Sequence, residues 1–429
     1  MLIVIENSGY YLDNLGDVSM LQVATRRLKN LWPNATIKVL TNSGDKLTHF
    51  CPNTYPLSPR GRQVWASPLA SRVYKVIPSK AAQYIADLEC QLRKYSPSLA
   101  SSILKLKFKL KRRTESATYF QEFMEAINGA DLVVATGGGY VTDVFEEGVL
   151  SNLDTLILAT SLGKPTVMLG QGLGPFWNQK SLTKLKAVFP LLDLVALREE
   201  RVGLPFLKSL GISQDRILVT GDDAIELAYE AHTRELGNGI GVNLRASKYS
   251  GVNQGIFETV QLALQGAAMR RDVPLVAVPI SCSSYKGYED SDSLTIQKLL
   301  KGYDDTSDGG QYLDTPLKVI EQVRHCRVVV TGSYHAGVFA LAQGVPVIGL
   351  AKSQYYLDKF LGLADQFGSG CDVILLDNDR QLREKLEASI LKAWEEAEQL
   401  RPQLLESARR QIEMGYAAYQ RVYELVQSR

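Results

Sequence analysis

The sequence predicts an α/β protein with two Rossmann-type domains, whose parallel sheets face a central cleft, and a long C-terminal helix. Three observations favour this fold class. The chain has 429 residues, more than one hydrophobic core usually holds. Short apolar runs alternate with helix-like stretches, which is typical of parallel sheets. The alternation breaks at residues 231–239 and then starts again.

The first half carries the pattern of one Rossmann-type domain. We predict strands at residues 2–5, 36–40, 131–135, 166–169, 193–197 and 216–219. Helices are predicted between them, at residues 18–30, 79–127, 150–162 and 180–188. Residues 45–75 are rich in Pro, Ser and Arg and give no clear pattern. These elements indicate an N-terminal domain over residues 1–230.

The second half repeats the pattern. Strands are predicted at residues 239–244, 274–279, 326–330 and 345–350, and helices at 254–271, 294–302, 316–324 and 336–343. They indicate a C-terminal domain over residues 239–380. Amphipathic spacing from about residue 380 to 427 predicts a helical segment, residues 381–429, that packs back across both domains.

Composition excludes several classes of protein. The formal net charge of +2 gives no signal for nucleic acid. Five cysteines lack metal-ligand or disulfide spacing, and four histidines are too few for a multi-histidine metal centre, so no metal is expected. The opening apolar run, MLIVI, is too short for a signal peptide, and no stretch approaches the roughly 20 apolar residues of a membrane span. A cytoplasmic enzyme is expected, and the oligomeric state stays open.

Glycine-rich segments follow two predicted strands. Gly137, Gly138 and Gly139 come directly after residues 131–135, and the run 170–175, which contains Gln171 and Gly172, follows residues 166–169. Glycine lets backbone N–H groups approach a ligand closely. A third loop, Asn14 to Asp17, follows the first strand. The alternative for each segment is a tight turn that binds nothing.

Charged side chains also end the strands. Arg198, Asp223, Arg245 and Lys352 each follow an apolar run, and ligands of open parallel sheets bind at such strand ends. An arginine there can grip a phosphate or carboxylate, although a structural ion pair is equally plausible. His335 follows residues 326–330 and is the candidate acid/base, with helix capping as its alternative.

A basic run, KLKFKLKRR at residues 105–113, alternates lysine with apolar residues. A solvated helix face is the favoured interpretation. A peripheral contact with a membrane surface or an anionic polymer is the alternative.

Taken together, these motifs resemble the polysaccharide pyruvyl transferase family. The similarity covers most of the chain, from Asn14 to about Gly368. The matching motifs are the N-x-G-D loop at 14–17, the GGG at 137–139 followed by Asp143, the GQGLGP at 170–175, the pair Arg198-Glu199, Asp223-Ala224, the strand end at 243–245, and Gly332-Ser333-Tyr334-His335-Ala336 followed by Gly344-Val345-Pro346-Val347-Ile348.

The resemblance implies a GT-B arrangement, with the N-terminal domain on the acceptor side and the C-terminal domain on the donor side. It implies transfer of the pyruvyl group from phosphoenolpyruvate, as a co-substrate and without a cofactor, onto hydroxyls of a glycan or lipid-linked sugar as a ketal. The implied catalytic residues are His335, Asp17 and Asp143. The implied substrate-binding residues are Asn14, Gly137, Gly138, Gly139, Gln171, Gly172, Arg198, Asp223, Arg245, Ser333, Tyr334 and Lys352.

One position departs from the family pattern. Ser333 stands where the family has an arginine that would bind phosphoenolpyruvate. Losing that cation costs a few kcal/mol, about the strength of a charged hydrogen bond, unless Arg198, Arg245 or Lys352 replaces it. Two alternatives follow: a GT-B glycosyltransferase that uses a nucleotide-sugar donor, or a non-catalytic sugar-binding member of the family.

Overall fold

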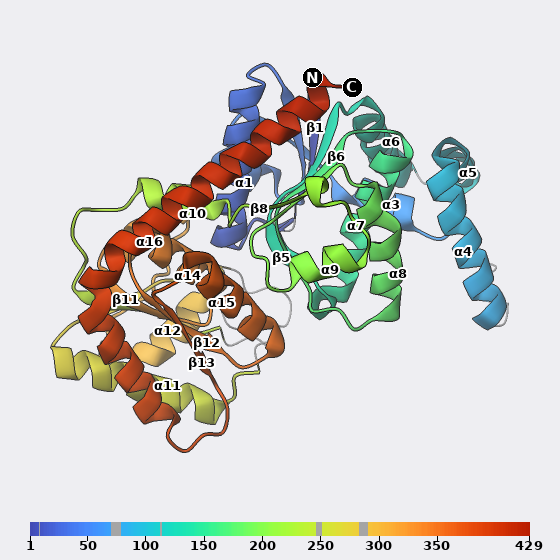
Figure 1. Ribbon diagram of the computed structural model, residues 1–429. Helices are drawn as coiled ribbons and strands as arrows, with labels where there is room; N and C mark the ends of the chain where they lie inside the picture. The colour runs from blue at the N-terminus through green and yellow to red at the C-terminus, as the bar shows by residue number, and fades with distance from the viewer. Residues whose placement is uncertain (8, 70–78, 112–113, 246–250, 283–290) are drawn as a thin grey trace.

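The computed structural model describes residues 1–7, 9–69, 79–111, 114–245, 251–282 and 291–429. It contains two parallel sheets, one in each domain, and a long helix that crosses both domains (Figure 1). The α/β fold class predicted from the sequence, with two Rossmann-type domains, is therefore confirmed.

The N-terminal sheet has eight strands within the described residues. Seven of them lie in the order β3 (Thr54–Leu57), β2 (Thr36–Leu40), β1 (Leu2–Glu6), β4 (Leu132–Ala135), β6 (Thr166–Leu173), β7 (Leu194–Leu197) and β8 (Ile217–Val219). The eighth, β5 (Gly138–Val141), pairs with β6 beyond the end of β4. Strand β3 was not predicted because its middle residues, Tyr55 and Pro56, are exposed and break the apolar pattern.

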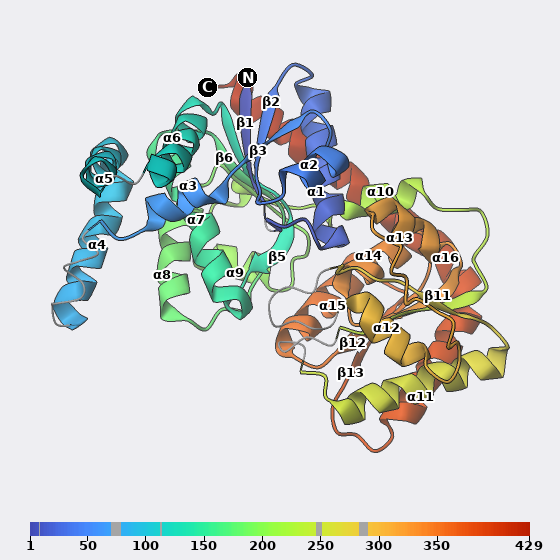
Figure 2. The same ribbon diagram turned by 180° about the vertical axis from the view of Figure 1, so that it is seen from behind.

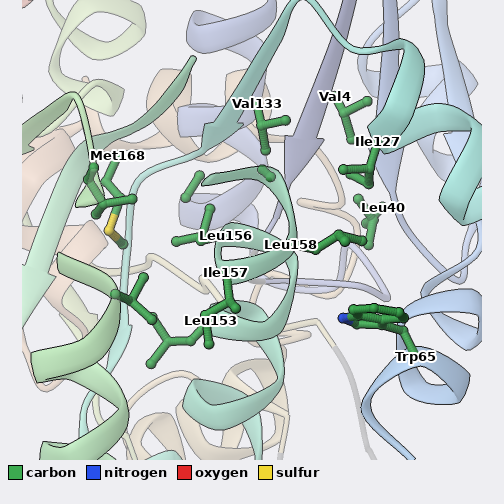
Figure 3. Close-up of a cluster of buried hydrophobic side chains, with 14 of the residues drawn as sticks. Val4, Leu40, Trp65, Ile127, Val133, Leu153, Leu156, Ile157, Leu158 and Met168 are labelled. Carbon is green, nitrogen blue, oxygen red and sulfur yellow. The ribbon is translucent and has the colours of Figure 1, made fainter. Parts of the chain in front are cut away.

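Helices cover both faces of this sheet (Figures 1 and 2). They are α1 (Leu15–Leu31), α2 (Gly44–Phe50), α3 (Pro59–Ala66), α6 (Thr114–Gly129), α7 (Glu146–Ser161), α8 (Gln179–Val188) and α9 (Gly203–Ser209). Helices α4 (Ser79–Tyr95) and α5 (Pro97–Lys111) form a hairpin that stands away from the sheet (Figures 1 and 2). Figure 3 shows Leu153 and Ile157 of α7 in the core, with Val133 of the sheet above them and Trp65 of α3 to one side. Burial of these apolar side chains drives the packing.

The C-terminal sheet has five strands in the part of the chain that is described. Their order is β10 (Leu275–Ala277), β9 (Gly239–Asn243), β11 (Cys326–Thr331), β12 (Val347–Ala351) and β13 (Cys371–Leu375). The helices around it are α11 (Gln254–Arg271), α12 (Asp292–Leu300), α13 (Pro316–Val323), α14 (Tyr334–Ala342) and α15 (Gln354–Phe367). Every paired strand in both sheets is parallel to its neighbour.

Two helices join the domains. Helix α10 (Ala224–Glu230) follows the last strand of the N-terminal sheet, but its apolar residues lie in a hydrophobic cluster with the C-terminal domain. Helix α16 (Leu382–Gln427) begins against the C-terminal sheet, where Ile390 is buried, and ends against the N-terminal domain, where Val422 is buried. None of the helices in the described ranges has both the length and the apolar character needed to cross a bilayer.

Hydrogen bonds also join the two domains beside the cleft. The amide of Leu15 donates to the carbonyl of Ile280 at 2.9 Å, and the amide of Cys282 donates to the carbonyl of Asp13 at 2.9 Å. On the opposite side, the hydroxyl of Tyr355 on α15 donates to the carbonyl of Gly139 at 2.8 Å. These bonds set the spacing of the strand ends that face each other.

Candidate functional site

A cavity of about 350 Å³ lies between the domains. Residues of both domains line it, and many of them lie near the ends of strands, as expected for ligand sites of parallel α/β folds. They are Tyr10, Asn14, Asp17, Gly139, Tyr140, Phe145, Asn152, Arg245, Ile280, Ser281, Asp292, Ser333, Tyr334, His335, Tyr355, Tyr356 and Lys359. A narrower recess beside it contains Gly172 and Arg198 and shares Gly139, Tyr334, Tyr355 and Lys359 with the cavity.

His335 occupies the first turn of α14 and reaches from the C-terminal domain toward the N-terminal one. Its Nε2 lies 3.6 Å from Oδ2 of Asp222, which follows β8. The imidazole is backed by Gly16, where an added Cβ would come within 2.0 Å of the ring. Residue 16 of the predicted N-x-G-D loop therefore has to be glycine, because any side chain there would collide with His335. Among the described residues, Nε2 of His335 is buried and has no hydrogen-bond partner.

Asp222 links His335 to Arg198. The Nη1 of Arg198 lies 3.3 Å from Oδ2 of Asp222. Burial acts to raise the pKa of Asp222, but the proximity of His335 and the charge of Arg198 outweigh it and lower this pKa below its ordinary value. An ionised carboxylate orients a neighbouring imidazole. Asp222 therefore positions both His335 and Arg198.

The guanidinium group of Arg198 lies over an aromatic ring. Its guanidinium carbon is 4.0 Å from the centre of the Tyr334 ring, a cation–π contact that fixes the plane of the side chain. The side chain is almost fully buried, and its Nε has no hydrogen-bond partner in the described part of the chain. A buried arginine with a free donor is available to an anionic ligand.

Lys359 on α15 supplies a second cation to the same place. Its Nζ lies 4.0 Å from the centre of the Tyr355 ring and 5.9 Å from those of Tyr334 and Tyr356. Within the described residues, no carboxylate lies within 4.0 Å of this nitrogen. Burial and the nearby charge of Arg198 lower the pKa of Lys359 well below its ordinary value. Binding an anion between the two cations would relieve this repulsion.

Two predicted glycines make room for these cations. A Cβ on Gly139 would come within 2.6 Å of Nη2 of Arg198 and 2.7 Å of Nζ of Lys359. A Cβ on Gly172 would come within 2.7 Å of Nε of Arg198. The glycine-rich strand ends therefore give the cations space, rather than forming a phosphate loop of their own.

Arg245 lies on another wall of the cavity, just after β9. Its Nη1 forms an ion pair with Oδ1 of Asp292 at 2.6 Å. The other oxygen of Asp292 accepts hydrogen bonds from the amides of Ile280 and Ser281, each at 2.9 Å. Asp292 thus fixes both the arginine and the segment that contacts the N-terminal domain.

Asp17 faces His335 from the start of α1. Burial raises the pKa of Asp17, and the positive charges of His335, Lys359 and Arg198 oppose the increase. Asn14 caps the same helix, with its side-chain oxygen accepting from the amides of Gly16 and Asp17 at 3.0 and 3.1 Å. The cap orients Asp17 toward the cavity.

The N-terminal wall of the cavity is a buried polar network. Arg62 donates to Glu6 at 2.9 Å and to Oδ1 of Asn152 at 3.0 Å. The hydroxyl of Tyr10 contacts the same three side chains. Tyr10 and Asn152 line the cavity, while Glu6 and Arg62 lie behind them. This wall offers fixed polar groups to a neutral, hydroxyl-bearing ligand.

Asp223, predicted to bind substrate, lies outside the cavity and has a structural role. Its Oδ1 forms an ion pair with Arg27 at 2.8 Å, and its Oδ2 accepts from the hydroxyl of Tyr419 at 2.8 Å. The residue therefore connects α1, α10 and α16. The preceding residue, Asp222, is the one that faces the site, because consecutive side chains at a strand end point in different directions.

Asp223→Ala is expected to lower the free energy of unfolding by about 1–3 kcal/mol, because it removes one of the two carboxylates that pair with buried Arg27 and leaves the Tyr419 hydroxyl without its acceptor. Glu226 still pairs with Arg27 in this variant. Urea unfolding measures the change. Asp365→Ala is the matched control. It removes an exposed ion pair with Arg201 at 3.0 Å, which contributes about 1 kcal/mol or less. Unchanged stability together with loss of ligand binding would restore the substrate-binding prediction for Asp223.

Asp143 and Gln171 also lie outside the cavity. The Oδ2 of Asp143 accepts from the amides of Trp177 and Asn178 at 2.5 and 2.6 Å, so the carboxylate holds the loop before α8. The Nε2 of Gln171 donates to the carbonyl of Thr136 at 2.5 Å. Strand β6 runs further than predicted, which places Gln171 within the sheet. Neither side chain therefore lies where the predicted catalytic role of Asp143 or the predicted binding role of Gln171 would require it.

Three further predicted positions do not line the cavity or the recess. Gly137 lies just before β5 and Gly138 is the first residue of that strand, and a Cβ on Gly137 would meet Met20 at 2.8 Å. Lys352 lies against Gly251. Lys352 was predicted to bind substrate, but the lysine that lines both the cavity and the recess is Lys359 of α15. No three His, Cys, Asp or Glu side chains gather as a metal-binding group in the described ranges.

Comparison with known proteins identifies the family. A family model for polysaccharide pyruvyl transferase matches residues 14–354, most of the chain. The chain belongs to the polysaccharide pyruvyl transferase family. The matched range contains His335, Asp17, Arg198 and Arg245, but ends before Lys359.

This polysaccharide pyruvyl transferase family member also has a distant relative. It is 22% identical over 271 residues to the amylovoran biosynthesis protein AmsJ of Erwinia amylovora. The match covers 58% of this chain and 62% of the relative's length.

Solved structures confirm the GT-B fold of this pyruvyl transferase family member. A glycosyltransferase from Rickettsia africae has a TM-score of 0.52 at 10% identity, covering 99% of this chain and 98% of that one. The UDP-GlcNAc 2-epimerase from Neisseria meningitidis bound to UDP-GlcNAc has a TM-score of 0.50 at 14% identity, covering 96% and 98%. At these identities the likeness shows the fold alone.

Proposed function

We propose that this protein transfers the pyruvyl group of phosphoenolpyruvate onto two hydroxyls of a polysaccharide, or of its sugar precursor, as a ketal. Family membership supports a polysaccharide-modifying transferase. The observation that carries the proposal is the pair of cations, Arg198 and Lys359, in one recess beside His335. Phosphoenolpyruvate needs both charge neutralisation and a proton donor.

Lys359 replaces the missing arginine of the family pattern in this proposal. Ser333 lines the cavity without adding charge, whereas Lys359 approaches from α15 and shares the Tyr334 ring with Arg198. Ser333 is also the N-cap residue of α14, and its side chain makes no capping hydrogen bond. The start of that helix is therefore open to a phosphate. In this arrangement the donor lies across Arg198, Lys359 and the first turn of α14.

The proposed reaction starts with proton transfer from the His335 imidazolium to C3 of phosphoenolpyruvate, which leaves an oxocarbenium-like centre at C2. One sugar hydroxyl attacks C2 and returns its proton to His335. The C2–O bond to phosphate breaks, and the second hydroxyl closes the ketal. Of the two hydroxyl protons, one ends on the new methyl group and the other on phosphate. Asp222 orients the imidazole, and Asp17 orients the attacking hydroxyl.

The polar wall opposite the donor suits the acceptor. Tyr10 and Asn152 face the cavity and are held by Glu6 and Arg62. Fixed neutral donors and acceptors at this position can recognise sugar hydroxyls without competing for the anionic donor. The proposal therefore puts the glycan against the wall that contains Tyr10 and Asn152, and phosphoenolpyruvate between the domains, against Arg198, Lys359 and the start of α14.

A nucleotide-sugar glycosyltransferase is the second candidate. The open helix start at Ser333 favours it, because a diphosphate can bind there too. Ligand-induced shifts of the melting temperature separate the candidates, since a ligand stabilises the state that binds it. A rise with phosphoenolpyruvate but not with UDP-GlcNAc is expected. A rise with UDP-GlcNAc alone would favour the glycosyltransferase, and no rise with either would favour a non-catalytic member.

A further inference from the structure

The hairpin of α4 and α5 exposes an unusual amount of apolar surface. It extends from the N-terminal domain on the side away from the C-terminal domain (Figures 1 and 2). Of the 20 large apolar side chains exposed in the described residues, seven lie on these two helices. Single exposed apolar residues are normal, but a cluster indicates a contact surface.

The exposed residues of α5 form a continuous stripe. It consists of Leu99, Ile103, Leu106 and Leu110, which are exposed by 55%, 38%, 58% and 76%. Their spacing of four, three and four residues places them on one face of the helix. We call this set the α5 stripe. On α4, Tyr84, Leu88 and Tyr95 are exposed with compatible spacing.

The α5 stripe is not the face that attaches the hairpin to the protein. Ala100, Leu104 and Phe108 make that attachment and are buried in the N-terminal core. The ring of Phe108 lies 5.8 Å from that of Phe120 on α6. Folding therefore accounts for the buried face of α5 and leaves the stripe without a partner among the described residues.

The positive charge of the hairpin indicates which kind of partner the α5 stripe contacts. Residues 79–113 contain nine lysines and arginines but only two carboxylates, although the whole chain has a net charge of +2. Lys105 and Lys109 are exposed and flank the stripe. A second copy of the chain would bring two such cationic hairpins together, which like-charge repulsion opposes. An anionic lipid surface satisfies both the apolar stripe and the lysines.

We infer that the α4–α5 hairpin docks the protein on anionic membranes, with the α5 stripe inserted at the level of the headgroups and the flanking lysines on lipid phosphates. The inference is independent of the proposed reaction. For the basic run at residues 105–113, the inference favours the membrane-surface alternative over a solvated helix face. A transferase held in this way would work on acceptors presented at a membrane surface.

Vesicle sedimentation of the full-length chain tests the inference. Binding to phosphatidylcholine vesicles that contain phosphatidylglycerol is expected to exceed binding to pure phosphatidylcholine by at least about tenfold and to weaken with salt. Leu106→Ser combined with Leu110→Ser should lower binding about tenfold. Lys105→Glu combined with Lys109→Glu should lower it at least as much.

Matched variants on the C-terminal domain serve as controls. Leu294→Ser with Leu317→Ser, and Lys301→Glu with Lys392→Glu, change equally exposed types of residue and should keep vesicle binding within about twofold, since neither pair adjoins the stripe. Melting curves check that every variant folds. Equal binding to neutral and anionic vesicles, no binding, or full binding by the leucine variants would overturn the inference. So would a dimer in light scattering that the leucine variants abolish.

Discussion

His335→Gln is expected to lower kcat for pyruvyl transfer by about 10²–10⁴-fold, the usual contribution of a general acid/base. The physical reason is that the enol carbon must receive a proton, and a neutral amide cannot supply one. Phosphate release from phosphoenolpyruvate in the presence of an acceptor sugar measures the effect. The melting shift caused by phosphoenolpyruvate should persist, because Arg198 and Lys359 remain in place.

His325→Gln is the matched control for this experiment. His325 is exposed at the end of α13, and its replacement should leave turnover unchanged. Full activity of His335→Gln would remove His335 from the mechanism. A loss of phosphoenolpyruvate binding together with turnover would instead make the histidine part of the donor site.

Lys359→Met is expected to weaken phosphoenolpyruvate binding by about 10–100-fold, the value of a charged hydrogen bond. Methionine keeps the apolar stem that packs on Tyr355 and removes only the charge. Steady-state kinetics should show this loss mainly as a higher KM for phosphoenolpyruvate. Lys352→Met is the control, since Lys352 lies outside the cavity, and it should have little effect.

A second substitution tests whether Lys359 stands in for the family arginine. Ser333→Arg in the Lys359→Met background should restore part of the lost affinity, because position 333 lines the same cavity. The absence of any rescue, with a folded double variant, would mean that the two positions serve different groups of the ligand. Unchanged KM in Lys359→Met alone would refute its role.

The pH profile gives an independent readout of the same residue. The pKa of Lys359 is lowered by burial and by Arg198, so Lys359 is charged below that pKa and loses its proton as pH rises through it. The KM for phosphoenolpyruvate should therefore begin to rise at a lower pH than it would if Lys359 had the pKa of an ordinary lysine. In Lys359→Arg this rise should move to higher pH, because arginine keeps its charge.

The strand–helix alternation was readable because each core strand is an apolar run that is buried on both faces, as residues 132–135 are. Edge strand β3 could not be predicted in this way, since two of its four residues face solvent. The glycine motifs marked the correct strand ends, but no sequence pattern indicated that Gly139 and Gly172 leave space for cations.

The sequence by itself determined the two-domain α/β fold and brought Asn14, Asp17, Gly139, Arg198, Arg245 and His335 to notice, because strand ends of parallel sheets meet at one edge. Only the tertiary structure decided which of two nearby residues lies at the site. Asp222 rather than Asp223 faces His335, Lys359 rather than Lys352 lines the cavity, and Asp143 holds a loop outside it. The direction of a side chain at a strand end, and the approach of a helix from the other domain, depend on packing between segments far apart in the chain. No local pattern encodes that packing.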